Sequence, residues 1–232
     1  MNFRITFHLD GSGVYYDPNE PTMLDGLLAW VLGPRQGIRG LDRSGIPQDV
    51  QLPLMRESFG DTWVWRASAL FPVGPQGEGL WHWRKRLRQS RIDLTTGSPN
   101  LQNGQYRDWQ TPLPLTLCTQ MVAYANGNGK EMRRILREVK YVGKKSAHGH
   151  GKVLSVDVDP IEQDHSLVMD GRAMRWLPDS EGARLVRPRP PYWHPHGRIA
   201  SCEIGSLRPN AVLSGCGGAN DQETGTGGPQ SA

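Results

Sequence analysis

An amphipathic helix that leads directly into a glycine-rich loop and then into a strand is the feature that most constrains the fold. Apolar side chains recur at helical spacing from Met132 onward, behind a capping residue at Asn126 or Asn128. The loop follows over 143–151, and the β-branched run 152–158 after it predicts a strand. This succession favours an α+β domain, in which helices cover one face of an antiparallel sheet.

The N-terminal segment predicts a strand followed by a helix. Apolar and polar side chains alternate over 3–9, as in a half-buried strand. An apolar stripe over 23–31 then predicts a helix that ends at Gly33. Thr22 is its expected N-cap, with Asp25 at the capping-box position.

The middle of the chain predicts two more strands separated by an insertion. Strands are expected at 62–71 and within 113–124, and residues 73–111 form the insertion between them. Together with the flanking elements, these segments give the order βαββαβ. That order predicts a ferredoxin-like domain over residues 1–160 that contains the insertion.

A β extension is expected after this domain, over residues 161–210. Its predicted elements are a hairpin around 167–177 and a return strand near 198–204. From 211 to 232 the chain is rich in small and polar residues that bury little apolar surface, so we expect a disordered tail.

Composition restricts the compartment and the cofactors. The 232 residues carry a net charge of +4, and the three cysteines lie far apart in the sequence. We therefore expect neither a disulfide framework nor a zinc site. The N-terminus has no signal-peptide pattern, and no segment is apolar over the length of a bilayer. These observations predict a cytoplasmic protein that has no membrane contact.

The glycine-rich loop and the helix before it form the first candidate binding site. Glycines allow a polyanion to approach the backbone and lysines neutralise phosphates, so the combination is typical of a clamp on a nucleic-acid backbone. The candidate RNA-binding residues here are Lys130, Arg133, Arg134, Arg137, Lys140, Gly143, Lys144, Lys145, Ser146, His148, Gly149, Gly151 and Lys152.

Two nucleotide-binding patterns are excluded for this loop. Glu138 stands where a Walker A loop needs its first glycine, and Ser146 comes one residue too late. A dinucleotide-binding fingerprint follows a strand and opens a helix, whereas this loop follows a helix and opens a strand.

A second basic cluster lies inside the insertion, where tryptophans stand beside cations. Aromatic rings next to Arg and Lys suit a finger that touches phosphates and offers stacking surfaces to bases. Its candidate RNA-binding residues are Trp83, Arg84, Lys85, Arg86, Arg88 and Arg91. The alternative is a solvated basic hairpin anchored by its tryptophans, and the two interpretations are compatible.

The histidines do not have the spacing of metal ligands. The pairs His148/His150 and His194/His196 have no Cys or carboxylate at a suitable distance in the sequence, so we expect no metal and no cofactor. His8, on the polar face of the first strand, and His148 are the acid–base candidates if the protein cleaves RNA.

The basic helix, the loop 143–151 and the strand after it resemble the RAMP superfamily of CRISPR-associated proteins. The segment 21–30, Pro-Thr-Met-Leu-Asp-Gly-Leu-Leu-Ala-Trp, is similar to the first helix of the 5′-handle-binding subunit of type IV CRISPR effector complexes. In that family the insertion between the second and third strands forms a thumb that kinks the guide RNA, and residues 73–111 occupy its place. The resemblance covers roughly residues 1–205.

This resemblance implies a non-enzymatic, architectural subunit that binds and caps the 5′ handle of the guide RNA. It also implies contacts with repeated backbone RAMP subunits, with a large subunit and, through the assembled complex, with target DNA in antiviral and anti-plasmid defence. Base pairing would then read the target sequence. Two alternatives stay open: an endoribonuclease of the same superfamily that cuts the guide precursor, and a stand-alone RNA chaperone.

Overall fold

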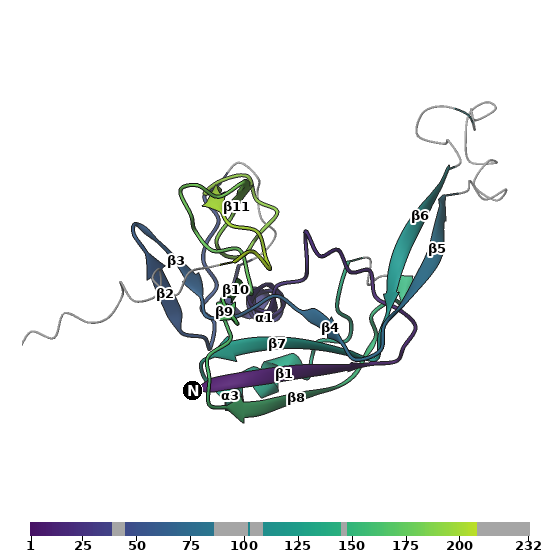
Figure 1. The fold of residues 1–232 in the computed structure, drawn as a ribbon, viewed down its shortest axis with the longest axis horizontal. Helices are drawn as coiled ribbons and strands as arrows, with labels where there is room; N and C mark the ends of the chain where they lie inside the picture. The colour runs from purple at the N-terminus through teal and green to yellow at the C-terminus, as the bar shows by residue number, and fades with distance from the viewer. Residues whose placement is uncertain (39–44, 86–101, 103–108, 145–147, 208–232) are drawn as a thin grey trace, which may run out of the picture.

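The centre of the molecule is a four-stranded antiparallel sheet in the order β4-β7-β1-β8 (Figure 1). In a computed structural model, the chain is described over residues 1–38, 45–85, 102, 109–144 and 148–207. The strands of this sheet are β4 (Phe71–Val73), β7 (Gln120–Asn126), β1 (Asn2–Leu9) and β8 (Val153–Ile161). The strand predicted over 3–9 is confirmed, and the fold is α+β.

Two helices pack against one face of the sheet, and the main core lies between them and the strands. They are α1 (Leu24–Leu32) and α3 (Gly129–Leu136), and the short 3-10 helix η1 (Pro34–Gln36) follows α1. Ile5 and Phe7 of β1 are fully buried in one cluster with Leu28 of α1 and Ile135 of α3. Burial of such side chains contributes about 1.5–3 kcal/mol each, so this interface is the main source of stability.

The described residues also form four two-stranded antiparallel ribbons outside this sheet. They are β2 (Arg56–Phe59) with β3 (Thr62–Trp65), β5 (Gly77–Lys85) with β6 (Trp109–Leu117), β9 (Val168–Met169) with β10 (Arg172–Ala173), and β11 (Arg184–Val186) with β12 (Ile199–Ser201). The hairpin expected around 167–177 and the return near 198–204 are confirmed. The expected disordered tail, 211–232, lies outside the described residues.

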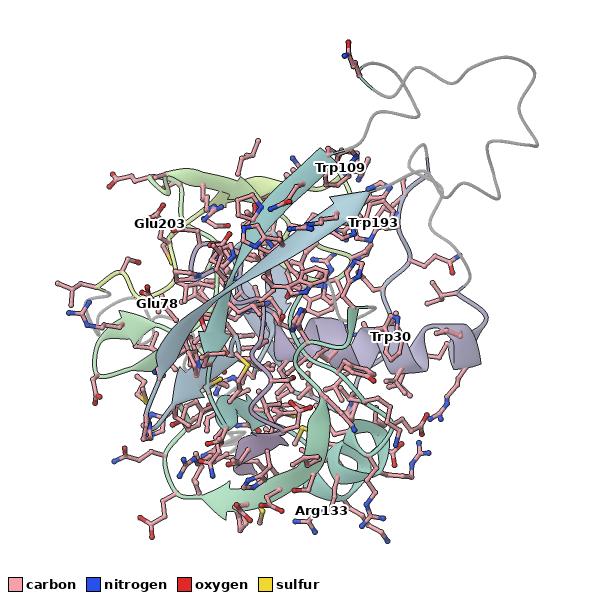
Figure 2. The ribbon with its side chains drawn as sticks, turned by 90° about the vertical axis from the view of Figure 1, so that its right-hand side faces the viewer. Trp30, Glu78, Trp109, Arg133, Trp193 and Glu203 are labelled. Atoms are coloured by element: carbon pink, nitrogen blue, oxygen red, sulfur yellow. The ribbon has the colours of Figure 1, made fainter. Side chains whose placement is uncertain are left out.

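The β5–β6 hairpin projects away from the sheet (Figure 1). It stands in front of the body when the molecule is viewed from that side, with Trp109 towards its outer end (Figure 2). The strand predicted within 113–124 is therefore two strands, β6 and β7, separated at Cys118 and Thr119. Strand-forming residues on both sides of Cys118 and Thr119 hid this break in the sequence.

The prediction of one continuous strand over 62–71 is wrong. Residues 62–65 pair with β2, and only 71–73 form a regular strand beside β7. Between them the chain follows β7 irregularly: Ser68 N donates to Tyr124 O, and Tyr124 N donates to the Ser68 hydroxyl, both at 2.8 Å. Ala69 N bonds instead to Met174 O at 2.9 Å. The side chains between β3 and β4 are small and fully buried. The backbone can therefore bond to Met174 as well as to β7, and it leaves the regular hydrogen-bond ladder of the sheet.

β8 runs through Asp159-Pro160, where the sequence predicted its end. Pro160 is paired with Phe3, and β8 is an edge strand of the sheet. A proline cannot donate a hydrogen bond, but at an edge its nitrogen can face away from the neighbouring strand. The edge position therefore makes the proline tolerable inside the strand.

One of the two predicted helix caps is correct. Asn128 caps α3, and its side chain accepts a hydrogen bond from Glu131 N at 3.2 Å. The Thr22 cap of α1 is wrong: the N-cap is Met23, which makes no side-chain cap. Asp25 does not complete a capping box, because its carboxylate is engaged in a buried contact with the C-terminal part of the chain.

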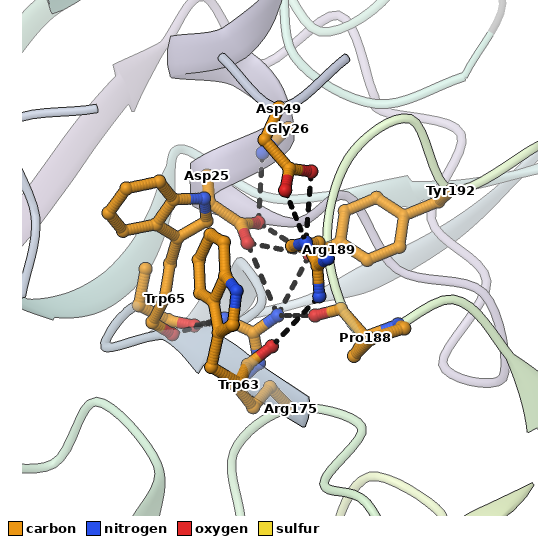
Figure 3. Close-up of polar contacts among 10 residues, drawn as sticks. Asp25, Gly26, Asp49, Trp63, Trp65, Arg175, Pro188, Arg189 and Tyr192 are labelled. Carbon is orange, nitrogen blue, oxygen red and sulfur yellow. Dashed lines mark hydrogen bonds and ion pairs between the residues drawn. The ribbon is translucent and has the colours of Figure 1, made fainter. Parts of the chain in front are cut away.

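That contact fastens residues 174–192 to α1 and β3 through Arg175, a fully buried cation (Figure 3). Its guanidinium donates to Asp25 Oδ2 at 3.2 Å and to the Tyr192 hydroxyl at 2.9 Å. It also donates to three backbone carbonyls, those of Trp65, Ala67 and Pro188. A buried charge needs this many partners, because its loss of hydration costs several kcal/mol.

Protonation in this cluster follows from its burial. Burial raises the pKa of the Asp25 carboxyl, an effect that the Arg175 guanidinium opposes. Burial also raises the pKa of the Tyr192 hydroxyl well above its usual value, so this group stays protonated. It donates to the Asp25 carboxylate at 2.7 Å.

Within the described ranges, every helix is too short or too polar to cross a membrane.

Candidate nucleic-acid interface

The first component of the candidate site is one face of the β5–β6 hairpin. Trp81 and Trp83 are two residues apart on β5, so both side chains point to the same face. Their partners on β6 are Leu113 and Thr111, and Leu113 is buried. Trp109 meets Trp83 edge-on, with ring centroids 4.3 Å apart. The hairpin thus has an aromatic face, and Arg84 lies on the opposite, exposed face.

The second component is the glycine-rich loop, which is closed at its base by backbone contacts. Val142 N donates to Gly151 O at 2.9 Å, and Tyr141 forms a bridge with Lys152. Gly143 and Gly151 have positive φ values of 84° and 70°. A Cβ on Gly151 would stand 2.1 Å from Val142 O, and one on Gly143 would stand 2.5 Å from Val14 Cγ2. These two glycines are therefore required by the packing of the loop itself.

Gly149 differs from the other two glycines. Its φ is 91°, but a Cβ there would meet nothing within 4 Å. It is exposed on the outer side of the loop. Of the three predicted glycines, this one has the open surroundings that close approach of a polyanion requires.

The structure brings the hairpin and the loop together through aromatic rings. The centroid of Trp81 lies 5.2 Å from that of His148 and 5.0 Å from that of His150. Trp83 lies 5.6 Å from His148. These separations are within the range of favourable ring pairs. The two clusters found separately in the sequence are therefore one region of the molecule.

Residues 13–15, which the sequence did not indicate, join the same two elements through backbone bonds. Val14 exchanges two 2.9 Å hydrogen bonds with Thr116 of β6. On the other side, Gly151 N donates to Gly13 O at 2.8 Å and Lys144 N donates to Tyr15 O at 3.3 Å. This connecting segment after β1 carries no motif, so only the three-dimensional arrangement reveals its role.

Lys144 is not a free cation. Its ammonium lies 2.6 Å from Glu20 Oε2 and 4.0 Å from Asp17 Oδ2. The ion pair is partly exposed, and such pairs contribute about 0–1 kcal/mol. A phosphate can therefore compete for Lys144, but it must displace the Glu20 carboxylate. The sequence did not predict this ion pair.

The cations predicted on the polar face of α3 differ in what they contact. Arg133 donates to Val158 O of β8 at 2.5 Å. Arg134 pairs with Glu131 at 2.5 Å, and its hydrogen bond lowers the pKa of that carboxyl. Lys140 donates to the Arg137 carbonyl at 3.4 Å, in the turn that follows the helix end at Leu136.

Lys130, Arg137 and Lys152 are exposed, and their side chains make no hydrogen bond or close ion pair with the described residues, although the charge of Lys152 helps to lower the pKa of the Asp10 carboxyl. They are the cations of the predicted set that are most available to phosphate. Several other predicted residues lie outside the described part of the chain: Lys145, Ser146, Arg86, Arg88 and Arg91. Lys85 is described only as the last backbone position of β5.

His8, one of the two acid–base candidates, lies on the sheet face away from the helices. Its Nε2 is 2.8 Å from Asp157 Oδ2, and its Nδ1 is 3.5 Å from the Gln120 amide nitrogen. A neutral ring that donates from Nε2 to Asp157 and accepts at Nδ1 satisfies both contacts. Both ring nitrogens therefore have neighbours within the sheet.

The histidine pairs do not come together with other ligands. Among the residues that the structure describes, no three His, Cys, Asp or Glu side chains are grouped as they would be around a metal ion. His148 and His150 face tryptophans, and the His194 ring accepts a hydrogen bond from His196 N at 3.0 Å.

The chain matches a known protein family. The family model described as CRISPR type IV associated protein Csf3 matches residues 1–97 and 76–203. The two matched segments overlap over residues 76–97, which contain β5, and together they include the four-stranded sheet, α1, α3 and the ribbons after β8. No curated protein matches the chain.

Proposed function

Because this chain belongs to the Csf3 family of type IV CRISPR-associated proteins, we propose that it is an architectural subunit of a type IV CRISPR ribonucleoprotein effector complex. In that complex it binds and caps the 5′ handle of the guide RNA. Its partners are repeated backbone RAMP subunits and a large subunit, and it meets target DNA through the assembled complex.

The core is proposed to be a ferredoxin-like domain of the RAMP type. The order β1-α1-β4-β7-α3-β8 and the sheet order β4-β7-β1-β8 support this assignment. Each pair of neighbouring strands in the sheet is antiparallel. The β5–β6 hairpin lies between β4 and β7, the position of the thumb insertion, and residues 161–210 are proposed as a β extension.

One observation carries the RNA-binding proposal: the rings of Trp81 and Trp83 meet those of His148 and His150. Two basic, aromatic segments that are far apart in the sequence thereby form a single candidate surface. Lys152 is exposed beside the loop, whereas Arg84 is exposed on the hairpin face opposite the rings. Cations next to rings suit an unpaired strand, whose phosphates and bases are both accessible.

We propose that the subunit does not cleave RNA. The occupied ring of His8 supports this, because general acid–base catalysis needs a ring nitrogen free to meet the substrate. The test is a metal-free assay on repeat RNA with the wild-type chain and the His8→Ala and His148→Ala variants. No cutting is expected. Cutting that either substitution abolishes would establish the endoribonuclease instead.

RNA binding is tested by removing two exposed cations that flank the loop in the sequence. The double variant Arg137→Ala/Lys152→Ala should bind 5′-handle RNA roughly tenfold more weakly at 0.15 M salt, because two phosphate contacts are lost. Arg172→Ala/Arg198→Ala is the control, with the same change in charge on the C-terminal ribbons. Equal losses of affinity in both double variants would show that only the overall charge of the protein matters, and this surface would then be removed from the proposal.

Partner contacts separate this proposal from a stand-alone RNA chaperone. Co-expression with the other type IV subunits should yield a complex that retains the guide. A chain that stays monomeric in the presence of those subunits, and that binds unrelated RNAs equally well, would favour the chaperone.

A further inference from the structure

One side of α1 is covered only in part by the rest of the described chain. The helix has one charged residue, Asp25, and its side chain is fully buried, so the remainder of the helix surface is apolar. A surface helix of a folded domain normally turns polar side chains towards water. Here Trp30 stands on the outer side, and it is 70% exposed. An apolar outer face of this kind indicates contact with another molecule.

A groove lies on this side of α1. Its volume is about 420 Å³, within the usual range of binding pockets. The helix contributes small residues to it, Gly26, Ala29 and Gly33, and residues 190–193 line it as well. Trp30 and Trp193 both line the groove and lie on the same side of the molecule (Figure 2). Trp193 is 50% exposed.

The lining segment 190–193 is fixed at two points (Figure 3). Directly before it, the Arg189 guanidinium lies 2.9 Å from the Asp49 carboxylate. Within it, the Tyr192 hydroxyl donates to Asp25 at 2.7 Å. The groove is therefore formed without a partner, and binding to a preformed groove costs less conformational entropy.

The surroundings of the groove carry positive charge without a matching carboxylate. Asp25 and Asp49 adjoin the groove, but each already holds an arginine. Arg198 is exposed, and its described contact is with the backbone carbonyl of the residue that follows the lining segment, at 3.4 Å. Arg187, three residues before that segment, is 4% exposed, and its Nε and Nη1 have no hydrogen-bond partner among the described residues. These two arginines favour a partner that brings an anion.

The chemistry of the groove suits a protein better than RNA. Apart from the aromatic rings, Gln48 is the only polar side chain among the described lining residues. The edge of a base would lose its hydrogen bonds to water here and regain few of them, whereas an apolar side chain has none to lose. RNA affinity also rests on several phosphate contacts, and two arginines supply few.

We propose that this groove docks a segment of another protein chain in which a bulky apolar side chain stands next to an Asp or Glu. The apolar side chain lies against Trp30 and Trp193, and the carboxylate pairs with Arg198. This inference goes beyond the proposed RNA surface on the hairpin and the loop, because it assigns a separate face of the subunit to protein contacts.

Two small probes of the same shape test this chemistry on the full chain. Phenylpropionate carries a ring and a carboxylate, and phenylpropionamide carries the ring without the charge. Both should bind at about 1–10 mM, as expected for ligands of this size. They should shift the indole N–H resonances of Trp30 and Trp193 and leave that of Trp109 unmoved.

The carboxylate probe should bind roughly two- to fivefold more tightly than the amide, the value of an exposed ion pair. Arg198→Gln should abolish this preference and leave the affinity for the amide unchanged. Equal affinities of the two probes for the wild-type chain, or shifts confined to other tryptophans, would overturn the proposal.

Docking itself is measured as the affinity of the chain for the other type IV subunits. Trp30→Ala should weaken it at least tenfold, because exposed tryptophans often dominate an interface. It should keep the melting temperature of the wild type, since most of the Trp30 side chain is exposed. Leu207→Ala is the control, because it removes an apolar side chain that is 72% exposed and outside the groove.

The outcomes separate this inference from the proposed function. If Trp30→Ala binds the subunits as tightly as the wild type does, the groove is not their docking site and the inference is wrong. A loss of handle-RNA affinity in the isolated Trp30→Ala chain would make RNA the occupant and contradict it equally. If the wild-type chain neither joins the subunits nor binds handle RNA, yet prefers the carboxylate probe, the proposed function fails and the chemistry of the groove stands.

Discussion

Arg175 donates a hydrogen bond to Asp25 across 3.2 Å, and neither side chain has any exposed surface. The pair joins the first turn of α1 to a segment 150 residues later in the chain. It explains why a residue at a capping position of the sequence makes no cap: the carboxylate of Asp25 is turned towards Arg175 and the Tyr192 hydroxyl.

Removing Arg175 should be severely destabilising. Arg175→Met leaves the Asp25 carboxylate buried without its cation and three backbone carbonyls without their donor, so we expect a loss of about 3–5 kcal/mol. Urea unfolding followed by tryptophan fluorescence measures it. Tyr192→Phe is the control, since it removes one hydroxyl and should cost about 1–2 kcal/mol. Similar losses in the two variants would show that the guanidinium is not the main fastener.

Releasing Lys144 from its ion pair should strengthen RNA binding. Glu20→Gln removes the carboxylate 2.6 Å from the ammonium, and we expect a two- to fivefold gain in affinity for handle RNA, roughly the value of an exposed pair. Asp49→Asn makes the same change in net charge, but releases Arg189, which is outside the candidate surface. A gain in Asp49→Asn as large as that in Glu20→Gln would mean that Lys144 has no particular role.

The glycines of the loop should differ in their tolerance of a side chain. Gly151→Ala places a Cβ 2.1 Å from Val142 O and should disrupt the base of the loop, whereas Gly149→Ala meets only the backbone cost of a positive φ, about 1–2 kcal/mol. Thermal unfolding of the two variants makes the comparison. A smaller effect of Gly151→Ala than of Gly149→Ala would contradict the packing role assigned to Gly151.

Asp164 should make stability depend on pH in the acid range. Burial opposes its ionisation, but hydrogen bonds from Ser166, Asn126 and Arg66 prevail and lower the pKa of its carboxyl below 3.8. A lowered pKa in the folded state adds stability above the unfolded value, and this stability is lost as pH falls through the folded value. Asp164→Asn should therefore cost about 1–3 kcal/mol at pH 7 and progressively less below about pH 4.

The control for this variant is Asp159→Asn, because Asp159 is exposed on β8 and makes no hydrogen bond or ion pair with the described residues, so its substitution should change stability little. Urea midpoints measured from pH 2.5 to pH 7 provide the comparison. A constant difference between wild type and Asp164→Asn over that range would exclude the proposed linkage.

The local sequence was sufficient to predict elements whose pattern depends only on residues nearby in the chain. The alternation in β1 and the helical spacing of α3 depend only on which face is buried, and Asn128 caps its own helix. The irregular path at Ala69 could not be foreseen in this way. Its backbone bonds to Met174, and nothing in residues 62–71 records that distant partner.

The candidate site shows the same limit. Glycine and lysine in the loop predict a candidate binding region, but they do not predict which residues contact them. Glu20 forms an ion pair with Lys144, and Trp81 contacts His148. Both lie far from the loop in the sequence and become its neighbours only in the folded chain. Composition identifies which groups can bind a phosphate, whereas folding determines which of them are already occupied.

The segment 13–15 has a consequence for the timing of assembly. It is made early in synthesis, yet its backbone partners, Thr116 and Gly151, emerge much later. Contacts between residues so far apart in the sequence form only after the chain has lost the conformational entropy that closing a long loop requires. A nascent chain on the ribosome therefore has no completed surface to offer until β8 has left the exit tunnel. On the proposed function, capture of a guide RNA would then follow synthesis through β8, so that an unfinished subunit would not trap RNA prematurely.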